Sequence, residues 1–146
     1  MFKKIRPLIF KFSPEVAHSL AIKTLKSNLI PSSKAIDSEI LKTKLFGKNI
    51  KNPIGVAAGF DKNAEVYNPL FKLGFGFVEV GTITPNPQYG NPKPRVFRLE
   101  EDKALINRLG FNNSGSDEIS ARIKKNSAHG LLGINIGPNK DTKNRV

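Results

Sequence analysis

Three apolar segments of this sequence end in small and polar residues, the combination from which binding sites are built in parallel α/β proteins. The segments are 54–58, 77–80 and 131–136. In such folds the binding groups lie at the carboxyl ends of the strands. Here those ends carry the ammonium group of Lys62, the hydroxyl of Thr82 and the carboxamide of Asn135. Lys62 offers a point charge for a carboxylate or an electron-rich ring oxygen, whereas Thr82 and Asn135 offer uncharged hydrogen bonds.

Each of these strand ends, taken singly, has an ordinary turn as its alternative, because Gly and Asn are common in turns. Their coincidence at three strand ends favours a binding site. The glycines among them would let the backbone approach a flat ligand or a phosphate closely.

A second group of polar side chains lies between residues 107 and 113. It contains the carboxamides of Asn107, Asn112 and Asn113 together with the guanidinium of Arg108. Carboxamides supply the paired donors and acceptors that match a cyclic imide or amide. The alternative is an Asn-rich turn that precedes the helix beginning at Ser114, and without context this alternative is slightly favoured.

Several familiar sites are missing from the sequence. It has no Cys and only two His, which excludes thiolate chemistry and a His-based metal site. It also lacks the dinucleotide fingerprint, the P-loop, the serine-hydrolase elbow and the zinc-protease motif. His129 precedes a glycine and is expected on the surface, whereas His18 is expected beside the apolar stripe of a helix.

The elements that must position these groups alternate between strand and helix. One helix is predicted over 63–73, capped by Asn63, with either a kink at Pro69 or a start delayed to Asn68. A second helix is predicted after a capping-box-like start at Ser114. A loop with four prolines lies between them, followed by an edge strand or hairpin arm over 95–99. Alternating strands and helices predict an α/β protein with a parallel sheet. Three strands are too few to close a barrel, so we expect the pattern to be unfinished.

The N-terminal residues predict two short amphipathic helices. The first covers 2–12 or begins at Pro7, and the second begins at Ser13-Pro14-Glu15, a typical N-terminal sequence. Such helices pack on their own domain, dock a partner or lie on a membrane surface. The first fate is the commonest.

The composition fits one domain, with 146 residues, 38% apolar residues and ten Phe. The sequence has no run of 18 apolar residues, so no membrane-spanning helix is predicted. An early secretory signal is not expected either, and a cytoplasmic compartment is therefore the default expectation. The formal net charge is +12, and residues 1–51 hold eleven Lys and Arg against three acids. This asymmetry predicts attraction to phosphate backbones or anionic lipid, with a Lys-rich solvated surface as the equal alternative.

Five segments of the sequence together resemble the quinone-dependent (class 2) dihydroorotate dehydrogenase family. They cover essentially the whole chain, in order. The segments are 52–63, 74–82, 92–99, 106–113 and 133–140. The resemblance implies the N-terminal part of a (β/α)8 TIM barrel, about three strands, preceded by a small helical extension. The implied domains are an amphipathic extension at the membrane and quinone entrance (1–33), a linker (34–48) and an incomplete FMN-binding barrel (49–146).

The same resemblance implies a function, the oxidation of dihydroorotate to orotate in pyrimidine biosynthesis with FMN as cofactor. Electrons pass to ubiquinone or menaquinone at the membrane surface, on the cytoplasmic side of the inner membrane, where the enzyme is peripheral. The implied cofactor contacts are Ala58, Gly59, Phe60, Asp61, Lys62, Thr82 and Asn135. The implied substrate contacts are Lys62, Asn107, Arg108, Leu109, Gly110 and Phe111. The implied quinone-side residues are His18 and Arg98.

The resemblance also implies what this chain lacks. The family's base is a Ser in a loop after the fourth strand, beyond Val146, so no residue of the chain is expected to be that base and no metal is expected. The chain as given is expected not to turn over. A small basic module that binds nucleic acid or anionic lipid is the second hypothesis, although nucleic acid is not expected because no aromatic side chains interleave with the basic ones.

Overall fold

The computed structural model describes residues 2–27, 29 and 38–143. Two helices come first, α1 (Phe2–Ile9) and α2 (Pro14–Lys26). Pro7 lies inside α1, so the alternative start at Pro7 is wrong. The predicted start of α2 is confirmed, with Ser13 extended and Pro14 as the first helical residue, although the Ser13 side chain makes no capping hydrogen bond.

Helix α2 packs on the domain that follows it. Its Ile22 and Leu25 are buried and belong to the main hydrophobic core. Helix α1 lies farther out, and its Leu8 is 61% exposed. Of the three fates open to these helices, packing on the domain therefore holds for α2.

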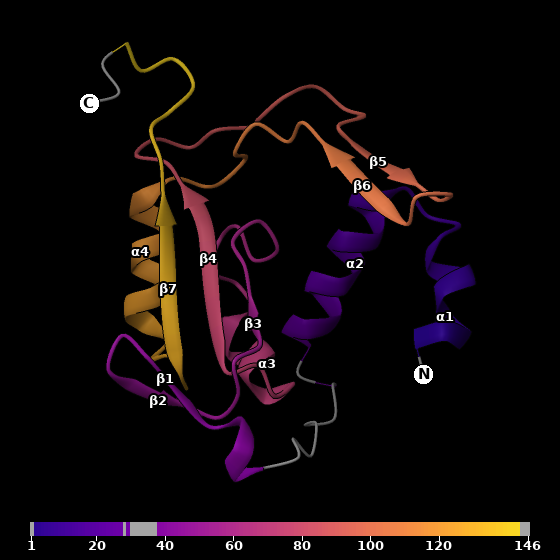
Figure 1. The fold of residues 1–146 in the computed structure, drawn as a ribbon. Helices are drawn as coiled ribbons and strands as arrows, with labels where there is room; N and C mark the ends of the chain where they lie inside the picture. The colour runs from indigo at the N-terminus through magenta and orange to yellow at the C-terminus, as the bar shows by residue number, and fades with distance from the viewer. Residues whose placement is uncertain (1, 28, 30–37, 144–146) are drawn as a thin grey trace.

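A three-stranded parallel sheet carries the core. It consists of β3 (Gly55–Val56), β4 (Phe77–Ile83) and β7 (Leu131–Ile136), with β4 in the middle. Val78 and Val80 of β4 are fully buried, because alternate side chains of a strand point to the same face. All three strands run in the same direction, so the loops after β3, β4 and β7 gather at one edge of the sheet (Figure 1).

Two helices complete the strand–helix alternation, with starts that differ from those predicted. Helix α3 (Tyr67–Lys72) begins within one residue of the delayed start at Asn68. Pro69 then lies in the first turn, where no backbone N–H is needed. Helix α4 (Ser116–Lys125) follows Gly115, and no side chain caps it. The predicted cap at Asn63 is wrong because its side chain instead accepts a hydrogen bond from the Ser114 N–H at 2.9 Å. The predicted start at Ser114 is wrong because the helix begins at Ser116.

Two hairpins complete the described structure. The first, β1 (Thr43–Leu45) with β2 (Lys48–Ile50), follows the 3-10 helix η1 (Glu39–Leu41). It lies partly in the range predicted as a linker, whose earlier residues 34–37 lie outside the described residues. The second, β5 (Val96–Leu99) with β6 (Ala104–Asn107), includes the predicted edge strand. It lies beside α2, away from α4 on the opposite flank of the sheet (Figure 1). Among the described residues, no helix is long and apolar enough to cross a membrane.

Candidate active site

Two polar cavities meet where the loops after β3 and β4 approach α2 and the β5–β6 hairpin. The helix-side cavity, about 660 Å³, is lined by residues that include Glu15, His18 and Arg95. The strand-side cavity, about 490 Å³, is lined by residues that include Thr82 and Phe111. Both cavities share the residues Gly59, Lys62, Asn107, Leu109 and Asn112. The junction therefore combines one cation with two carboxamides.

The strand-side cavity brings together most of the residues that the sequence singled out. They are Ala58, Gly59, Lys62, Thr82, Asn107, Arg108, Leu109, Gly110 and Phe111. Phe60 and Asp61 line the helix-side cavity instead. Residues more than 50 positions apart in the chain thus face one space, as a binding site at strand ends requires.

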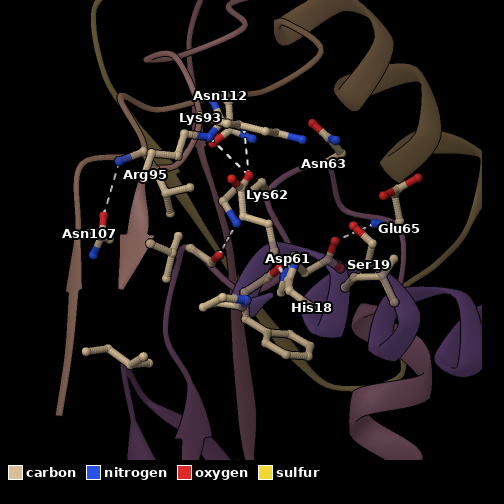
Figure 2. A pocket seen from close by; sticks show the side chains of 18 of the residues that line it. His18, Ser19, Asp61, Lys62, Asn63, Glu65, Lys93, Arg95, Asn107 and Asn112 are labelled. Carbon is tan, nitrogen blue, oxygen red and sulfur yellow. Dashed lines mark hydrogen bonds and ion pairs between the residues drawn. The ribbon is translucent and has the colours of Figure 1, made fainter. Parts of the chain in front are cut away.

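Lys62 stands at the junction of the two cavities. Its Nζ donates a hydrogen bond to the Gly59 carbonyl oxygen at 2.6 Å. Burial lowers the pKa of Lys62, and the Glu15 carboxylate acts in the opposite direction. Figure 2 shows Lys62 between the Arg95 and Asn112 side of the pocket and His18. The ammonium group is therefore placed to meet an anionic or electron-rich ligand atom.

The Asp61 side chain fastens the loop after β3. It is 1% exposed, and its carboxylate accepts hydrogen bonds from the backbone N–H groups of Glu65 (2.7 Å) and Val66 (2.8 Å). Burial raises the pKa of Asp61, against these two hydrogen bonds. Its carbonyl oxygen also accepts the Gly81 N–H at 3.1 Å. The predicted cofactor contact of Asp61 stays a prediction, and the carboxylate itself is engaged with backbone.

Three polar side chains form a chain of hydrogen bonds at the ends of β4 and β7. The Thr82 hydroxyl donates to Asn135 Oδ1 at 2.7 Å, and Asn135 Nδ2 donates to Glu79 Oε1 at 3.1 Å. Because its proton is directed at Asn135, the Thr82 oxygen offers a ligand an acceptor. Asn135 thus reaches the site through Thr82.

The carboxamides of residues 107–113 divide into two kinds. Asn113 is buried and holds the turn before α4 through hydrogen bonds with Thr84, Phe111 and Gly115, so the turn alternative is confirmed for it. Asn107 and Asn112 line both cavities. Among the described residues, Asn112 Oδ1 is buried without a hydrogen-bond partner. Asn112 was outside the predicted site, although its place in the Asn-rich segment signalled it.

An apolar groove of about 870 Å³ lies between the N-terminal helices and the sheet, and it adjoins the helix-side cavity at Phe60, the neighbour of His18. Their rings meet edge to face at 5.3 Å, and His18 Nε2 lies 2.7 Å from the Phe60 carbonyl oxygen. A carbonyl oxygen can only accept, so His18 Nε2 carries the donated proton, and burial lowers the pKa of His18. Phe60 lines both spaces.

Arg98 lies on β5, at the end of α1. Its Nη1 donates hydrogen bonds to the carbonyl oxygens of Phe10 (3.3 Å) and Phe12 (2.8 Å). Its guanidinium carbon also lies 4.4 Å from the centroid of the Phe10 ring. These contacts satisfy carbonyl groups of the turn that follows α1, so Arg98 attaches the end of the first helix to the hairpin.

Sequence reasoning missed the ion pair between Glu15 and Arg95. Arg95 Nε and Nη2 each lie 3.0 Å from Glu15 Oε1, and the Arg95 residue is 7% exposed. The sequence indicates that Glu15 is an acid in the first turn of a helix. It indicates that Arg95 belongs to an edge strand or hairpin arm. No local pattern relates residues 80 positions apart, so only the fold reveals the pair.

Comparison with known proteins identifies the relatives of this chain. The family model described as "Dihydroorotate dehydrogenase" matches residues 40–145. A protein named dihydroorotate dehydrogenase (quinone) from Rhizobium leguminosarum is 51% identical over 146 residues, which are 99% of this chain and 40% of that protein. Proteins of the same name from Rhizobium meliloti and Rhodospirillum rubrum are 56% and 54% identical, each over 94% of this chain. The chain thus spans about 40% of the length of these curated relatives.

Solved structures indicate the same relationship. The ligand-free DHODH of Eimeria tenella superposes with a TM-score of 0.85 and 46% identity over 91% of this chain and 39% of its own. The complex of that enzyme with ferulenol gives a TM-score of 0.84 and 47% identity. The predicted fold class is confirmed as the N-terminal part of a (β/α)8 barrel with a helical extension. On the family match and these likenesses, the chain belongs to the dihydroorotate dehydrogenase family.

Proposed function

We propose that the full-length protein carrying this chain is a quinone-dependent dihydroorotate dehydrogenase that uses FMN and oxidises dihydroorotate to orotate. The observation that carries the proposal is the strand-side cavity, where Lys62, Thr82 and Asn107 face one space at the strand ends. The names of the relatives support dihydroorotate as its substrate.

The residues of the strand-side cavity fit a flavin. Gly59 has a φ of +103°, and a Cβ built there would meet nothing within 4 Å, so a flat ring can approach its backbone. The donor and acceptor set around it is complementary to a ring with carbonyl and N–H edges, since Lys62 donates and the Thr82 oxygen accepts. We assign FMN to Ala58 through Lys62, Thr82 and Asn135. The chemistry that FMN supplies when bound is acceptance of a hydride.

The substrate is assigned to Lys62 and the segment 107–111. Dihydroorotate carries a carboxylate and a cyclic imide. The Lys62 ammonium matches the negative charge, and the Asn107 carboxamide matches the imide edge. The Ser base of the family lies outside this chain, so the role of the described residues is to bind and orient the ring.

The quinone is assigned to the apolar groove. Its walls come from α1, α2 and the region around β3 and α3, including Leu8, Leu20 and Phe75. Phe60 lines both this groove and the helix-side cavity, which His18 also lines. Arg98 holds the adjoining end of α1. A quinone entering there would come from a bilayer, so we place the enzyme peripherally on the cytoplasmic side of the inner membrane.

The test is to purify the full-length protein and record its visible spectrum and its oxidation of dihydroorotate with a ubiquinone or menaquinone analogue. Bound yellow flavin together with quinone-dependent formation of orotate is expected. A purified, folded protein without flavin absorbance and without orotate formation would overturn the proposal. Lys62→Met is expected to lower kcat/KM at least a hundredfold, since a buried ammonium contact of the bound ligand is lost.

A further inference from the structure

The Glu15–Arg95 ion pair connects the N-terminal extension to the loop that lines the strand-side cavity. The Arg95 guanidinium is buried and makes four hydrogen bonds. Two go to Glu15 Oε1 on α2. Two more run from Nη1 to the carbonyl oxygens of Tyr89 (2.7 Å) and Asn91 (3.0 Å). A buried charge is tolerated when it is paired and hydrogen-bonded in this way.

The loop that Arg95 holds in turn holds the segment 107–111. The Asn91 N–H donates to the Leu109 carbonyl oxygen at 3.0 Å, and Asn91 Nδ2 donates to the Arg108 carbonyl oxygen at 2.7 Å. The backbone of Arg95 itself accepts the Arg108 N–H at 2.8 Å. Hydrogen bonds therefore run without a break from α2 through Arg95 and Asn91 to the backbone of the substrate segment.

Close packing makes this connection stiff. A Cβ built at Gly90 would lie 2.2 Å from the Leu109 carbonyl oxygen and 2.8 Å from Arg95 Nη1. The backbone of Gly90 is thus packed tightly against both partners. A displacement of Arg95 is therefore passed to Leu109.

We propose that Glu15 and Arg95 are positioning residues for substrate binding, through which α2 sets the place of segment 107–111. The inference rests on the proposed function and deepens it. It assigns to the helical extension a part in the oxidation of dihydroorotate, in addition to the quinone groove that the extension lines. Glu15 and Arg95 act through Asn91 and Leu109, so their loss changes KM for dihydroorotate and leaves the flavin in place.

Three variants of the full-length protein test the proposal. Glu15→Ala removes the partner of Arg95. Glu15→Gln removes the charge but keeps an oxygen that can accept the Arg95 hydrogen bonds. Glu65→Ala is the matched control, because Glu65 forms a second ion pair between the domain and α2, to Lys26, and has no part in the Arg95 connection. Figure 2 shows Glu65 on the opposite side of the pocket from Arg95.

Activity is measured with a soluble dye as electron acceptor, so that the quinone groove is not needed. Glu15→Ala is expected to raise KM for dihydroorotate about tenfold, with little change in kcat or flavin absorbance. Glu15→Gln restores most of the wild-type KM. If Glu15 acted only through the charge it presents to Lys62, Glu15→Gln would raise KM for dihydroorotate as much as Glu15→Ala does. That result would overturn the proposal. An equal rise of KM in Glu65→Ala would also overturn it, since any loosening of α2 would then suffice.

A second measurement does not depend on turnover. Hydrogen exchange at the backbone amides of Asn91 and Arg108, which donate within this connection, is expected to accelerate in Glu15→Ala and to stay at the wild-type rate in Glu65→Ala. Unchanged exchange in Glu15→Ala contradicts the connection. A wild-type protein that forms no orotate contradicts the proposed function instead. The hydrogen-exchange result still tests the connection, because it does not depend on activity.

Discussion

Single residues of this site are oriented by hydrogen bonds to their neighbours. Glu79 lies on β4 and accepts the Asn135 amide, which fixes the carboxamide with its oxygen toward Thr82. Without Glu79, the Asn135 side chain could rotate and offer its NH2 group to Thr82. The Thr82 hydroxyl would then turn its proton toward the ligand.

The residue-scale prediction is that Glu79→Leu weakens flavin binding about tenfold, while Glu79→Gln, which keeps an accepting oxygen, stays close to wild type. The flavin retained after dialysis, read from visible absorbance, checks it. Equal flavin retention in the Leu and Gln variants would contradict the proposed role of Glu79.

His18 makes a pH-dependent contribution to stability at the same scale. Burial lowers its pKa below the ordinary value of 6.5, with the Phe60 carbonyl, Asp61 and Glu15 opposing and Lys62 assisting. The unfolded chain therefore binds more protons than the folded one as the pH falls below that value, and the free energy of unfolding decreases.

The prediction follows from that sign. Between about pH 7.5 and about pH 5.5, wild type is expected to lose more stability than His18→Gln, whose side chain stays neutral. Urea unfolding at the two pH values measures the difference. The raised pKa of Asp61 acts with the opposite sign but is common to both proteins, so it cancels. A pH dependence as steep in His18→Gln as in wild type would exclude this role.

At the scale of elements, the register of β3 against β4 depends on a close backbone contact. The Gly76 N–H donates to the Ile54 carbonyl oxygen at 2.8 Å, and Asn52 Nδ2 donates to the Gly74 carbonyl oxygen at 2.9 Å. A Cβ built at Gly76 would lie 1.9 Å from the Asn52 carbonyl oxygen. The two segments can approach this closely only because residue 76 has no side chain.

Gly76→Ala is therefore expected to lower the free energy of unfolding by about 2 kcal/mol, because the backbone of residues 52–54 must move. Gly133→Ala is the matched control, since its Cβ would meet only ordinary contacts, at 3.4 Å from Glu79 Cγ. Chemical denaturation of the two full-length variants compares them. A loss in Gly133→Ala as large as in Gly76→Ala would refute the argument from the close contact.

The elements also show what the sequence could predict. Hydrophobic periodicity located β4, β7, α2 and α4, because buried faces leave a regular pattern. The helix starts could not be predicted from local sequence. Asn63 accepts a hydrogen bond from the distant Ser114 N–H instead of capping its own helix, and α4 begins after Gly115 without a side-chain cap. The same holds for the site. Lys62 and Thr82 follow apolar strands and are visible in the sequence, whereas Glu15 and Arg95 pair across 80 residues.

At the scale of the whole molecule, the N-terminal helices present apolar side chains that the domain does not cover. Ile5, Leu8, Phe12 and Leu20 are each more than 40% exposed, and they line the mouth of the apolar groove. Residues 2–26 also carry six Lys and Arg against one acid. Exposed apolar side chains on a basic segment are suited to the surface of an anionic bilayer, where both features contribute to binding.

We expect the full-length protein to bind vesicles that contain phosphatidylglycerol, with an affinity that falls as salt rises. Leu8→Ser should weaken this binding about tenfold, because most of the transfer free energy of one Leu side chain is lost. Ile40→Ser is the matched control, since Ile40 is 91% exposed on η1, outside the two helices. Co-sedimentation with vesicles measures both variants. Equal weakening in both variants would show that general hydrophobicity, and not the helices, drives vesicle binding. Tighter binding of the wild-type protein to a DNA duplex than to vesicles would instead favour a nucleic-acid partner for the basic region.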